Sequence, residues 1–181
     1  MTSQNADLAE LGWTPFFQSQ TTIEDLSRFL PVRVMAVHRG QLAVAGDGFE
    51  MTIPSHIPNA FSEEDYPTVG DWLLADGDMF RPDRILSRTS LFKRRAPGTG
   101  RRLQLIAANI DTLFIVSSCN QDFNIARLER YLVLAREAGV TPVVVLTKAD
   151  LADAPEDYAK AARGLMPGLM VETVNARDPD S

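Results

Sequence analysis

The sequence predicts a small β-barrel followed by a partial α/β unit, and three observations lead to this fold class. Between residues 31 and 92, short β-rich runs are separated by glycine-containing breaks. From residue 103 onward, apolar strand-like runs alternate with helical patterns. Between these two patterns, residues 81–102 hold eight Arg and Lys residues against one Asp, a local charge of +7 in a chain whose net charge is −6. A chain of 181 residues is long enough for two small domains of this kind.

The overall composition, 45% hydrophobic and 23% charged residues, is typical of a globular protein in water. No apolar stretch approaches the roughly 20 residues that a membrane-spanning helix needs. The N-terminus lacks the basic start and apolar core of a secretory signal, so a cytoplasmic location is expected. Cys119 is the single cysteine, and with only His38 and His56 beside it we expect no zinc site within these residues.

Residues 1–30 are interpreted as an N-terminal extension with a short helix over 22–29, in which Thr22 caps the first turn. Five strands are then expected, at residues 32–37, 41–45, 50–54, 69–75 and 84–91. Glycines in the breaks supply the positive φ angles of tight hairpins, and one long connection follows the third strand. This order suits a five-stranded, partly open barrel of the oligonucleotide-binding (OB) type. An SH3-like barrel is the nearest alternative.

The second half begins with residues 111–117, an apolar run that predicts a strand buried on both faces of a parallel sheet. Ile125, Leu128, Leu132 and Ala135 recur at helical spacing, with Asn124 or Asp122 as the N-cap and Gly139 as the C-terminal stop. A strand at 142–147, a helix at 155–165 capped by Asp153 and a strand at 169–174 follow. Three parallel strands and two helices make half of a doubly wound, three-layer α/β domain, so this domain is interpreted as truncated.

Thr147-Lys148-Ala149-Asp150 directly follows the strand at 142–147, where ligands bind in open α/β sheets. The tetrapeptide resembles the Asn-Lys-x-Asp motif with which GTPases recognise guanine, with Thr in place of Asn. One carboxylate at Asp150 accepts hydrogen bonds from two adjacent donors of guanine, N1–H and the exocyclic amine, which adenine does not offer together. Thr147 ties the loop back but lacks the amide donor of Asn. The alternative interpretation is an exposed loop that ends in a helix cap.

Asn175-Ala176 follows the next strand, where GTPases carry a Ser-Ala turn that offers a backbone N–H to the guanine carbonyl oxygen. No Gly-x-x-x-x-Gly-Lys phosphate loop occurs among the 181 residues, and no Asp-x-x-Gly spacing for a magnesium-linked switch. A GTPase with this order of motifs would be circularly permuted. No catalytic residue is therefore assigned within the chain.

A small barrel followed by a permuted order of motifs resembles the ribosome-small-subunit-dependent GTPase A family. The matching residues, which cover about 31–176, are Val69-Gly70-Asp71-Trp72, the RTSLFKRR run at 88–95, the AANID run at 107–111, Phe123-Asn124 with Leu128, Arg130, Tyr131 and Leu132, and Thr147-Lys148-Ala149-Asp150-Leu151.

The resemblance implies four segments: an N-terminal extension (1–30), an OB-fold barrel (31–92), a basic linker (93–102) and the first part of a circularly permuted P-loop GTPase domain (103–181). It implies GTP or GDP with Mg²⁺ in the full-length parent, and Zn²⁺ only in a C-terminal domain absent from these residues. The parent would be a GTP hydrolase acting late in maturation of the small ribosomal subunit. This fragment alone is expected to be inactive in hydrolysis.

The expected partners are the small ribosomal subunit with its rRNA and a guanine nucleotide, with no membrane and no DNA. Guanine would be held by Thr147, Lys148, Ala149, Asp150, Asn175 and Ala176. The candidate rRNA contacts are basic: Arg84, Arg88, Lys93, Arg94, Arg95, Arg101 and Arg102. Two alternatives stay open: an OB-fold RNA-binding module without nucleotide chemistry, and a Rossmann-like binding domain for another small ligand.

Overall fold

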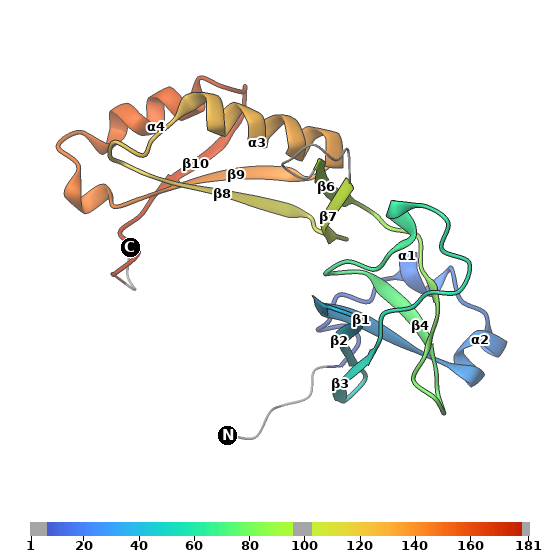
Figure 1. Cartoon of the computed structure of the whole chain (residues 1–181). Coiled ribbons are helices and arrows are strands. Elements are labelled where there is room, and N and C mark those ends of the chain that lie inside the picture. The colour runs from blue at the N-terminus through green and yellow to red at the C-terminus, as the bar shows by residue number, and fades with distance from the viewer. Residues whose placement is uncertain (1–6, 96–102, 179–181) are drawn as a thin grey trace. The chain divides into compact units, whose positions relative to one another are not determined.

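The computed structural model describes residues 7–95 and 103–178. The chain divides into two compact units, Met1–Asn109 and Ile110–Ser181. Figure 1 shows strands predominating in the first unit and helices lying along a sheet in the second. In the described part of the chain, no helix is both long and apolar enough to cross a lipid bilayer.

The first unit is built on an antiparallel sheet with the strand order β3-β2-β1-β4-β5. Its strands are β1 (Phe29–His38), β2 (Gln41–Gly46), β3 (Phe49–Pro54), β4 (Trp72–Asp76) and β5 (Pro82–Ile85). This sheet has five strands, the number predicted for the barrel. The barrel is not closed, because β3 and β5 lie at opposite edges of the sheet and do not pair with each other. The architecture is therefore OB-like, and the sheet is open.

The predicted fifth strand at 84–91 is wrong, because the sheet strand β5 ends at Ile85 and a separate strand, β6 (Leu91–Arg95), begins at Leu91. Between them, Leu86 is buried and its N–H donates to the Trp72 carbonyl at 2.9 Å. Arg88 then turns inward to a buried carboxylate. One expected strand is therefore replaced by two, β5 and β6, with residues 86–90 between them.

The described part of the N-terminal extension packs on the sheet through two short helices, α1 (Pro15–Gln18) and α2 (Ile23–Arg28). The expected cap of α2 is confirmed: the Thr22 hydroxyl accepts the Asp25 N–H at 3.0 Å, and the Asp25 carboxylate accepts the Thr22 N–H at 2.9 Å. Phe17 is buried against Trp72, whose indole is fully buried. The extension thus forms part of the core of the first unit.

The first unit ends in a hairpin made by β6 and β7 (Leu103–Ala108), followed by Asn109. Asn109 adopts a left-handed φ of 55°, and its side chain accepts the Thr89 N–H at 2.8 Å and donates to the Gly70 carbonyl at 3.0 Å. The preceding Ala108 N–H donates to the Val69 carbonyl at 2.8 Å. This Asn109 clamp fixes the point where the chain leaves the first unit. The predicted linker begins inside β6, and its residues 96–102 lie outside the described residues.

The second unit contains a sheet of three parallel strands, as predicted, and their order is β10-β9-β8. It contains β8 (Thr112–Ser118), α3 (Ile125–Ala138), β9 (Thr141–Thr147), α4 (Pro155–Arg163) and β10 (Met170–Thr173). Helix α3 is capped by the Asn124 side chain and ends at Gly139, which has a φ of 69°, so both predicted ends are confirmed. The predicted cap of α4 is wrong, since Ala154 occupies that position and Asp153 lies outside it.

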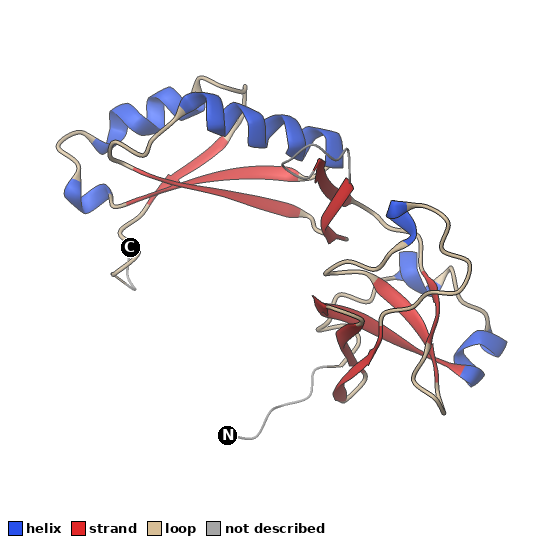
Figure 2. Cartoon of the chain, viewed as in Figure 1, coloured by secondary structure: helices blue, strands red, loops and turns tan. Residues whose placement is uncertain are grey.

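Both helices cover the same face of this sheet (Figure 2), where Ile115 and Val144 pack with Leu128. The strand β8 was expected to be buried on both faces, and this is wrong within the described residues. Phe114 and Val116 point to the uncovered face and are 64% and 63% exposed. The described part of the unit therefore has two layers in place of the expected three.

Candidate functional site

The loop after β9 holds the predicted guanine-binding tetrapeptide. Lys148 takes a left-handed conformation with a φ of 60°, which ends the strand and starts a short 3₁₀ helix, η2 (Ala149–Leu151). The Thr147 hydroxyl donates to the Ser117 carbonyl of β8 at 3.1 Å. The Ala149 N–H donates to the Val174 carbonyl at 3.4 Å, just beyond β10. These bonds tie the loop to both neighbouring strands, as the sequence predicts for Thr147.

A turn after β10 faces this loop. The Asn175 side-chain oxygen accepts the Arg177 N–H at 3.1 Å, and the Asn175 carbonyl accepts the Asp178 N–H at 2.9 Å. This local bonding fixes the backbone around Ala176. The two chain segments meet because both follow parallel strands at the carboxyl edge of one sheet.

Together the two segments line a cavity of about 200 Å³. Its lining residues are Thr147, Lys148, Asp150, Leu151, Asn175, Ala176 and Arg177. The structure thus brings five of the six predicted guanine-site residues to one cavity, and the sixth, Ala149, supplies the backbone bond that joins its two sides. The volume is below the roughly 300–1,000 Å³ of pockets for drug-sized ligands, so the cavity suits a base more than a whole nucleotide.

The fold leaves several polar groups of this cavity without a hydrogen-bond partner among the described residues. Within the described residues, the Asp150 carboxylate and the Ala176 N–H make no hydrogen bond. The same holds for the ammonium group of Lys148 in the described part of the chain, and both Lys148 and Asp150 are exposed. An aromatic ring with two adjacent N–H donors beside a carbonyl oxygen complements these groups, and guanine has that edge.

Thr147 and Lys148 also line a second cavity, of about 440 Å³, with Ser117, Arg127 and Tyr131 among its other residues. The Ser117 hydroxyl is buried and has no hydrogen-bond partner among the described residues. Lys148 therefore borders two adjacent cavities, and its side chain can contact the contents of either one.

The predicted RNA-binding residues lie in the first unit, and each one whose side chain is described already has a partner. Arg84 pairs with Asp25 at 3.1 Å, Lys93 with Glu64 at 2.6 Å, and Arg94 donates to Gln104 at 3.0 Å. Arg95 is the last residue of β6, and Arg101 and Arg102 lie outside the described residues. In these two ion pairs the side chains of Arg84 and Lys93 are about 40% exposed. Such partly exposed pairs are weak, so another anion can replace the carboxylate.

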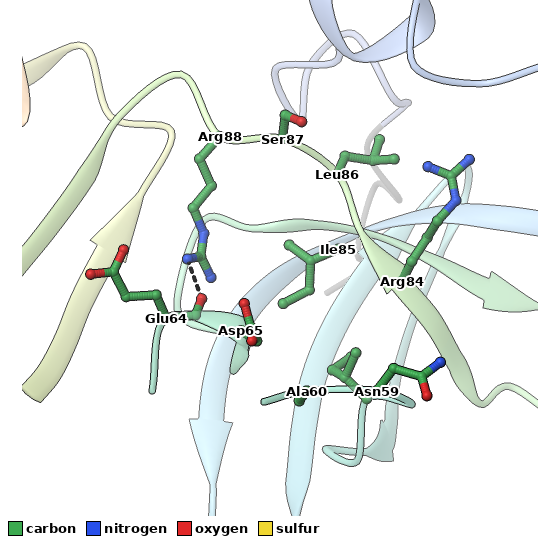
Figure 3. A pocket seen from close by; sticks show the side chains of 10 residues that line it. Asn59, Ala60, Glu64, Asp65, Arg84, Ile85, Leu86, Ser87 and Arg88 are labelled. Carbon is green, nitrogen blue, oxygen red and sulfur yellow. Dashed lines mark hydrogen bonds between the residues drawn. The ribbon is translucent and has the colours of Figure 1, made fainter. Parts of the chain in front are cut away.

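Arg88 differs from these, because its guanidinium is enclosed. It makes two 2.7 Å bonds to the fully buried Asp71 carboxylate, and it donates to the carbonyls of Glu64 at 2.7 Å and Tyr66 at 2.9 Å. Figure 3 shows the side chain reaching the Glu64 backbone, at the end of a cavity of about 310 Å³. Four of its five N–H groups are thus bonded inside the unit. Arg88 is therefore a structural residue, and little of its guanidinium is accessible to an external phosphate.

Asp65 lines the same cavity as Arg88 (Figure 3). Its carboxylate accepts the backbone N–H groups of Ser62 at 2.7 Å and Phe61 at 2.9 Å. These bonds hold the pKa of the Asp65 carboxyl below its ordinary value. In the second unit, burial raises the pKa of the Cys119 thiol, which favours the unreactive, protonated form. In the described residues, no group of three or more His, Cys, Asp or Glu side chains could hold a metal ion.

Sequence reasoning missed three features of these sites. Arg177 lines the base-sized cavity, and its position directly after Asn175-Ala176 was the available signal. The partner of Arg88 was not foreseen, because Asp71 is 17 residues away and nothing in the local pattern distinguishes it. The role of Asn109 as a clamp was also missed, although it lies inside the AANID run.

Residues 85–179 match the family model described as RsgA GTPase. Over 181 residues the chain is 44% identical to "Small ribosomal subunit biogenesis GTPase RsgA 2" of Vibrio parahaemolyticus, covering 99% of this chain and 48% of that protein. It is 47% identical over 179 residues to "Small ribosomal subunit biogenesis GTPase RsgA" of Mesorhizobium japonicum, covering 99% of this chain and 50% of that one. The chain thus spans about half the length of the curated relatives it matches.

A solved structure, the crystal structure of YjeQ from Thermotoga maritima, has a similar fold, with a TM-score of 0.58 over 80% of this chain and 51% of that one, at 20% identity. Since the family model matches more than half of the 181 residues, and its match includes both segments that line the base-sized cavity, the chain belongs to the RsgA GTPase family.

Proposed function

We propose that this chain is the guanine-reading and RNA-facing part of a GTPase that acts in biogenesis of the small ribosomal subunit. The names of its relatives, which are small ribosomal subunit biogenesis GTPases, support the proposal. The parent protein would bind the small subunit in the cytoplasm and hydrolyse GTP late in maturation. Neither a membrane nor DNA is part of this function.

The observation that carries the proposal is the uncommitted Asp150 carboxylate opposite the uncommitted Ala176 N–H, in one base-sized cavity of the described structure. The carboxylate would accept guanine N1–H and the exocyclic amine, and the Ala176 N–H would donate to the O6 oxygen. Each charge-assisted hydrogen bond of this kind contributes about 1.5–3 kcal/mol. A base without these donors would leave the carboxylate unpaired, so the site would discriminate strongly against such a base.

The other residues of the loop would position the base. Lys148 would lay its aliphatic stem along the ring and direct its ammonium toward the second cavity, where a phosphate-binding segment of the parent would lie. Thr147 and Ala149 would hold the loop, and Asn175 would fix the turn that presents Ala176. Mg²⁺ would accompany GTP or GDP in the parent, and Zn²⁺ would belong to a further domain. This fragment alone would not hydrolyse GTP, because it contains no phosphate loop.

We further propose that basic residues of the first unit contact rRNA. In this proposal the extension precedes an OB-like domain over 31–92, which is followed by the basic segment 93–102 and the GTPase part at 103–181. Lys93, Arg94, Arg95, Arg101 and Arg102 suit this role. Arg84 suits it as well, since its pair with Asp25 is partly exposed. Arg88 is the exception, because its guanidinium serves the interior of the unit.

The test is a titration of the ¹⁵N-labelled chain with GDP, ADP and XDP, followed by NMR. We expect GDP to shift the amide signals of Asp150 and Ala176, and ADP to leave them unchanged. Asp150→Asn should weaken GDP binding by at least about tenfold, from the loss of charge-assisted bonds, and should favour XDP, whose C2 carbonyl accepts the new amide N–H. Asp153→Asn is the matched control, because Asp153 is exposed and does not line the cavity.

Equal binding of GDP and ADP would refute guanine reading by this loop. RNA binding without any nucleotide response would favour the alternative function, an RNA-binding module without nucleotide chemistry.

A further inference from the structure

The first unit has a groove of its own beside β7, with a volume of about 410 Å³. The end of β1, the segment 66–69 and β7 form its walls, and we call it the β7 groove. Four of its lining residues carry large apolar or aromatic side chains that are between 37% and 55% exposed: Val37, Tyr66, Val69 and Ile106. Exposed apolar side chains gathered around one concave surface mark a binding site.

Tyr66 is the aromatic residue of this groove, and its backbone is held from behind. The Tyr66 carbonyl accepts a bond from the Arg88 guanidinium at 2.9 Å. Thr68 is buried, and its N–H donates to the Asp71 carboxylate at 2.8 Å. The buried pair of Arg88 and Asp71 thus fixes the wall that carries Tyr66, while Tyr66 itself stays 55% exposed. A flat aromatic side chain on a fixed wall is prepared to stack on another ring.

The opposite wall of the groove is the free edge of β7, which offers backbone hydrogen bonds. The Leu103 N–H points away from β6, because it donates to the Glu63 carboxylate at 2.8 Å. Leu105, two residues further along a regular stretch of the ladder, has the same orientation and lines the groove. Among the described residues, its N–H and carbonyl have no hydrogen-bond partner. Leu105 therefore presents a donor beside an acceptor, and the pairing edge of every nucleobase has this combination.

The charges around the groove suit a ligand with an anionic backbone. Arg94 is exposed, and it donates at 3.0 Å to Gln104, a neutral residue that lines the groove. That bond leaves the positive charge of Arg94 uncompensated. The two glutamates at the same rim are engaged: Glu64 pairs with Lys93 at 2.6 Å, and Glu63 accepts the Leu103 N–H. A phosphate that approaches β6 therefore meets an available cation beside the apolar groove.

We infer that the β7 groove binds an unpaired nucleotide of RNA. The base stacks on Tyr66, its pairing edge bonds to the Leu105 backbone, and a flanking phosphate contacts Arg94. The inference rests on the proposed contact of the first unit with rRNA, and it names the site and the class of nucleotide. A base enters such a groove only where it is free of a duplex, so the site selects single-stranded RNA and tolerates different sequences.

The experiment measures the affinity of the full chain for fluorescein-labelled decauridine, and for its duplex with decaadenylate, by fluorescence anisotropy over a range of salt concentrations. We expect the single strand to bind more tightly than the duplex. Tyr66→Leu should weaken binding of the single strand by about five- to 100-fold, the loss of one stacked base, without changing the salt dependence. Tyr66→Phe keeps the ring and should stay within about twofold of the native affinity.

Two control variants separate stacking from charge and from general stickiness. Arg94→Gln should weaken binding and reduce the slope of log affinity against log salt by about 0.7, the value for one lost phosphate contact on a single strand. Phe61→Leu removes an aromatic ring that is 91% exposed but does not line the groove, so native affinity is expected. In the ¹⁵N-labelled native chain, decauridine should shift the Leu105 amide signal, a result that does not depend on any variant.

The outcomes distinguish this inference from the proposed function. If RNA binds with a clear salt dependence but Tyr66→Leu leaves the affinity unchanged, or the duplex binds as tightly as the single strand, the inference is overturned and the rRNA contact stands. The groove would then suit a different occupant, such as an extended apolar peptide. If neither RNA binds even at low salt, the proposed rRNA contact fails and the inference fails with it.

Discussion

Replacement of Arg88 by alanine should destabilise the first unit far more than its place in a basic run would indicate. The substitution leaves the Asp71 carboxylate, which is 0% exposed, without both of its 2.7 Å guanidinium bonds. Among the described residues, the one bond left to that carboxylate is from the Thr68 N–H, at 2.8 Å. The carbonyls of Glu64 and Tyr66 also lose their donor.

Removal of one partner from a buried ion pair typically costs about 3–5 kcal/mol, because an uncompensated charge stays buried. Since small domains unfold with only about 5–15 kcal/mol, we expect Arg88→Ala to remove a large share of the stability of this unit. Arg84→Ala is the matched control. Its pair with Asp25 is 40% exposed on the arginine side, so a loss below about 1 kcal/mol is expected.

Equilibrium urea unfolding followed by tryptophan fluorescence measures this difference selectively. The chain has two tryptophans, and Trp13 and Trp72 both pack in the first unit with ring centroids 4.8 Å apart. Their emission therefore reports on that unit alone. A loss from Arg88→Ala below about 1 kcal/mol, or equal to that of Arg84→Ala, would refute the structural role of the buried pair.

Two further predictions use the same fluorescence assay. Gly70→Ala should destabilise the first unit strongly, because Gly70 has a φ of 89° and an added Cβ would lie 2.1 Å from the Ala108 carbonyl oxygen. Gly48→Ala is the control: Gly48 has a φ of 76° and open space around it, so this substitution costs only the backbone strain of about 1 kcal/mol. Equal losses of stability in the two variants would contradict the close approach at Gly70. The first unit should also lose stability as the pH falls below about 4. Backbone N–H bonds lower the pKa of three carboxyls in the folded chain, so these carboxylates stabilise the fold at neutral pH and stop doing so when they are protonated. The three are Asp25, Asp65 and Asp76. Unfolding midpoints measured from pH 7 to pH 3 should fall in the native chain and fall less in the triple Asn variant; parallel curves would contradict this assignment.

Local signals predicted the second unit well. Asn124 and Gly139 mark the ends of α3 because capping depends only on residues within one turn of the helix. The loop Thr147 to Asp150 was placed correctly beside Asn175 and Ala176, because parallel strands bring their carboxyl ends to one edge. The exposure of Phe114 was not predictable in this way, since an apolar strand has the same pattern whether or not a further layer covers it.

In the first unit, contacts between residues far apart in the sequence determine features that local sequence patterns do not predict. The run around Arg88 has the alternation of a strand and the charge of an RNA-binding segment. Its burial against Asp71 depends on a partner 17 residues earlier in the sequence. The same holds for Asn109, whose partners Thr89 and Gly70 lie 20 and 39 residues before it. Residue types alone do not reveal such contacts.

The Asn109 clamp has a practical consequence for dissection of this protein. A truncation that ends at residue 92 would follow the change in sequence pattern, but it would remove β7 and leave the Gly70 carbonyl and the Thr89 N–H without Asn109. A truncation that begins at residue 31 would remove Phe17 and uncover the indole of Trp72. The smallest piece that keeps its own interior covered therefore runs from the N-terminal helices through Asn109. Isotope labelling, crystallisation or RNA titration of the isolated first unit should use that piece.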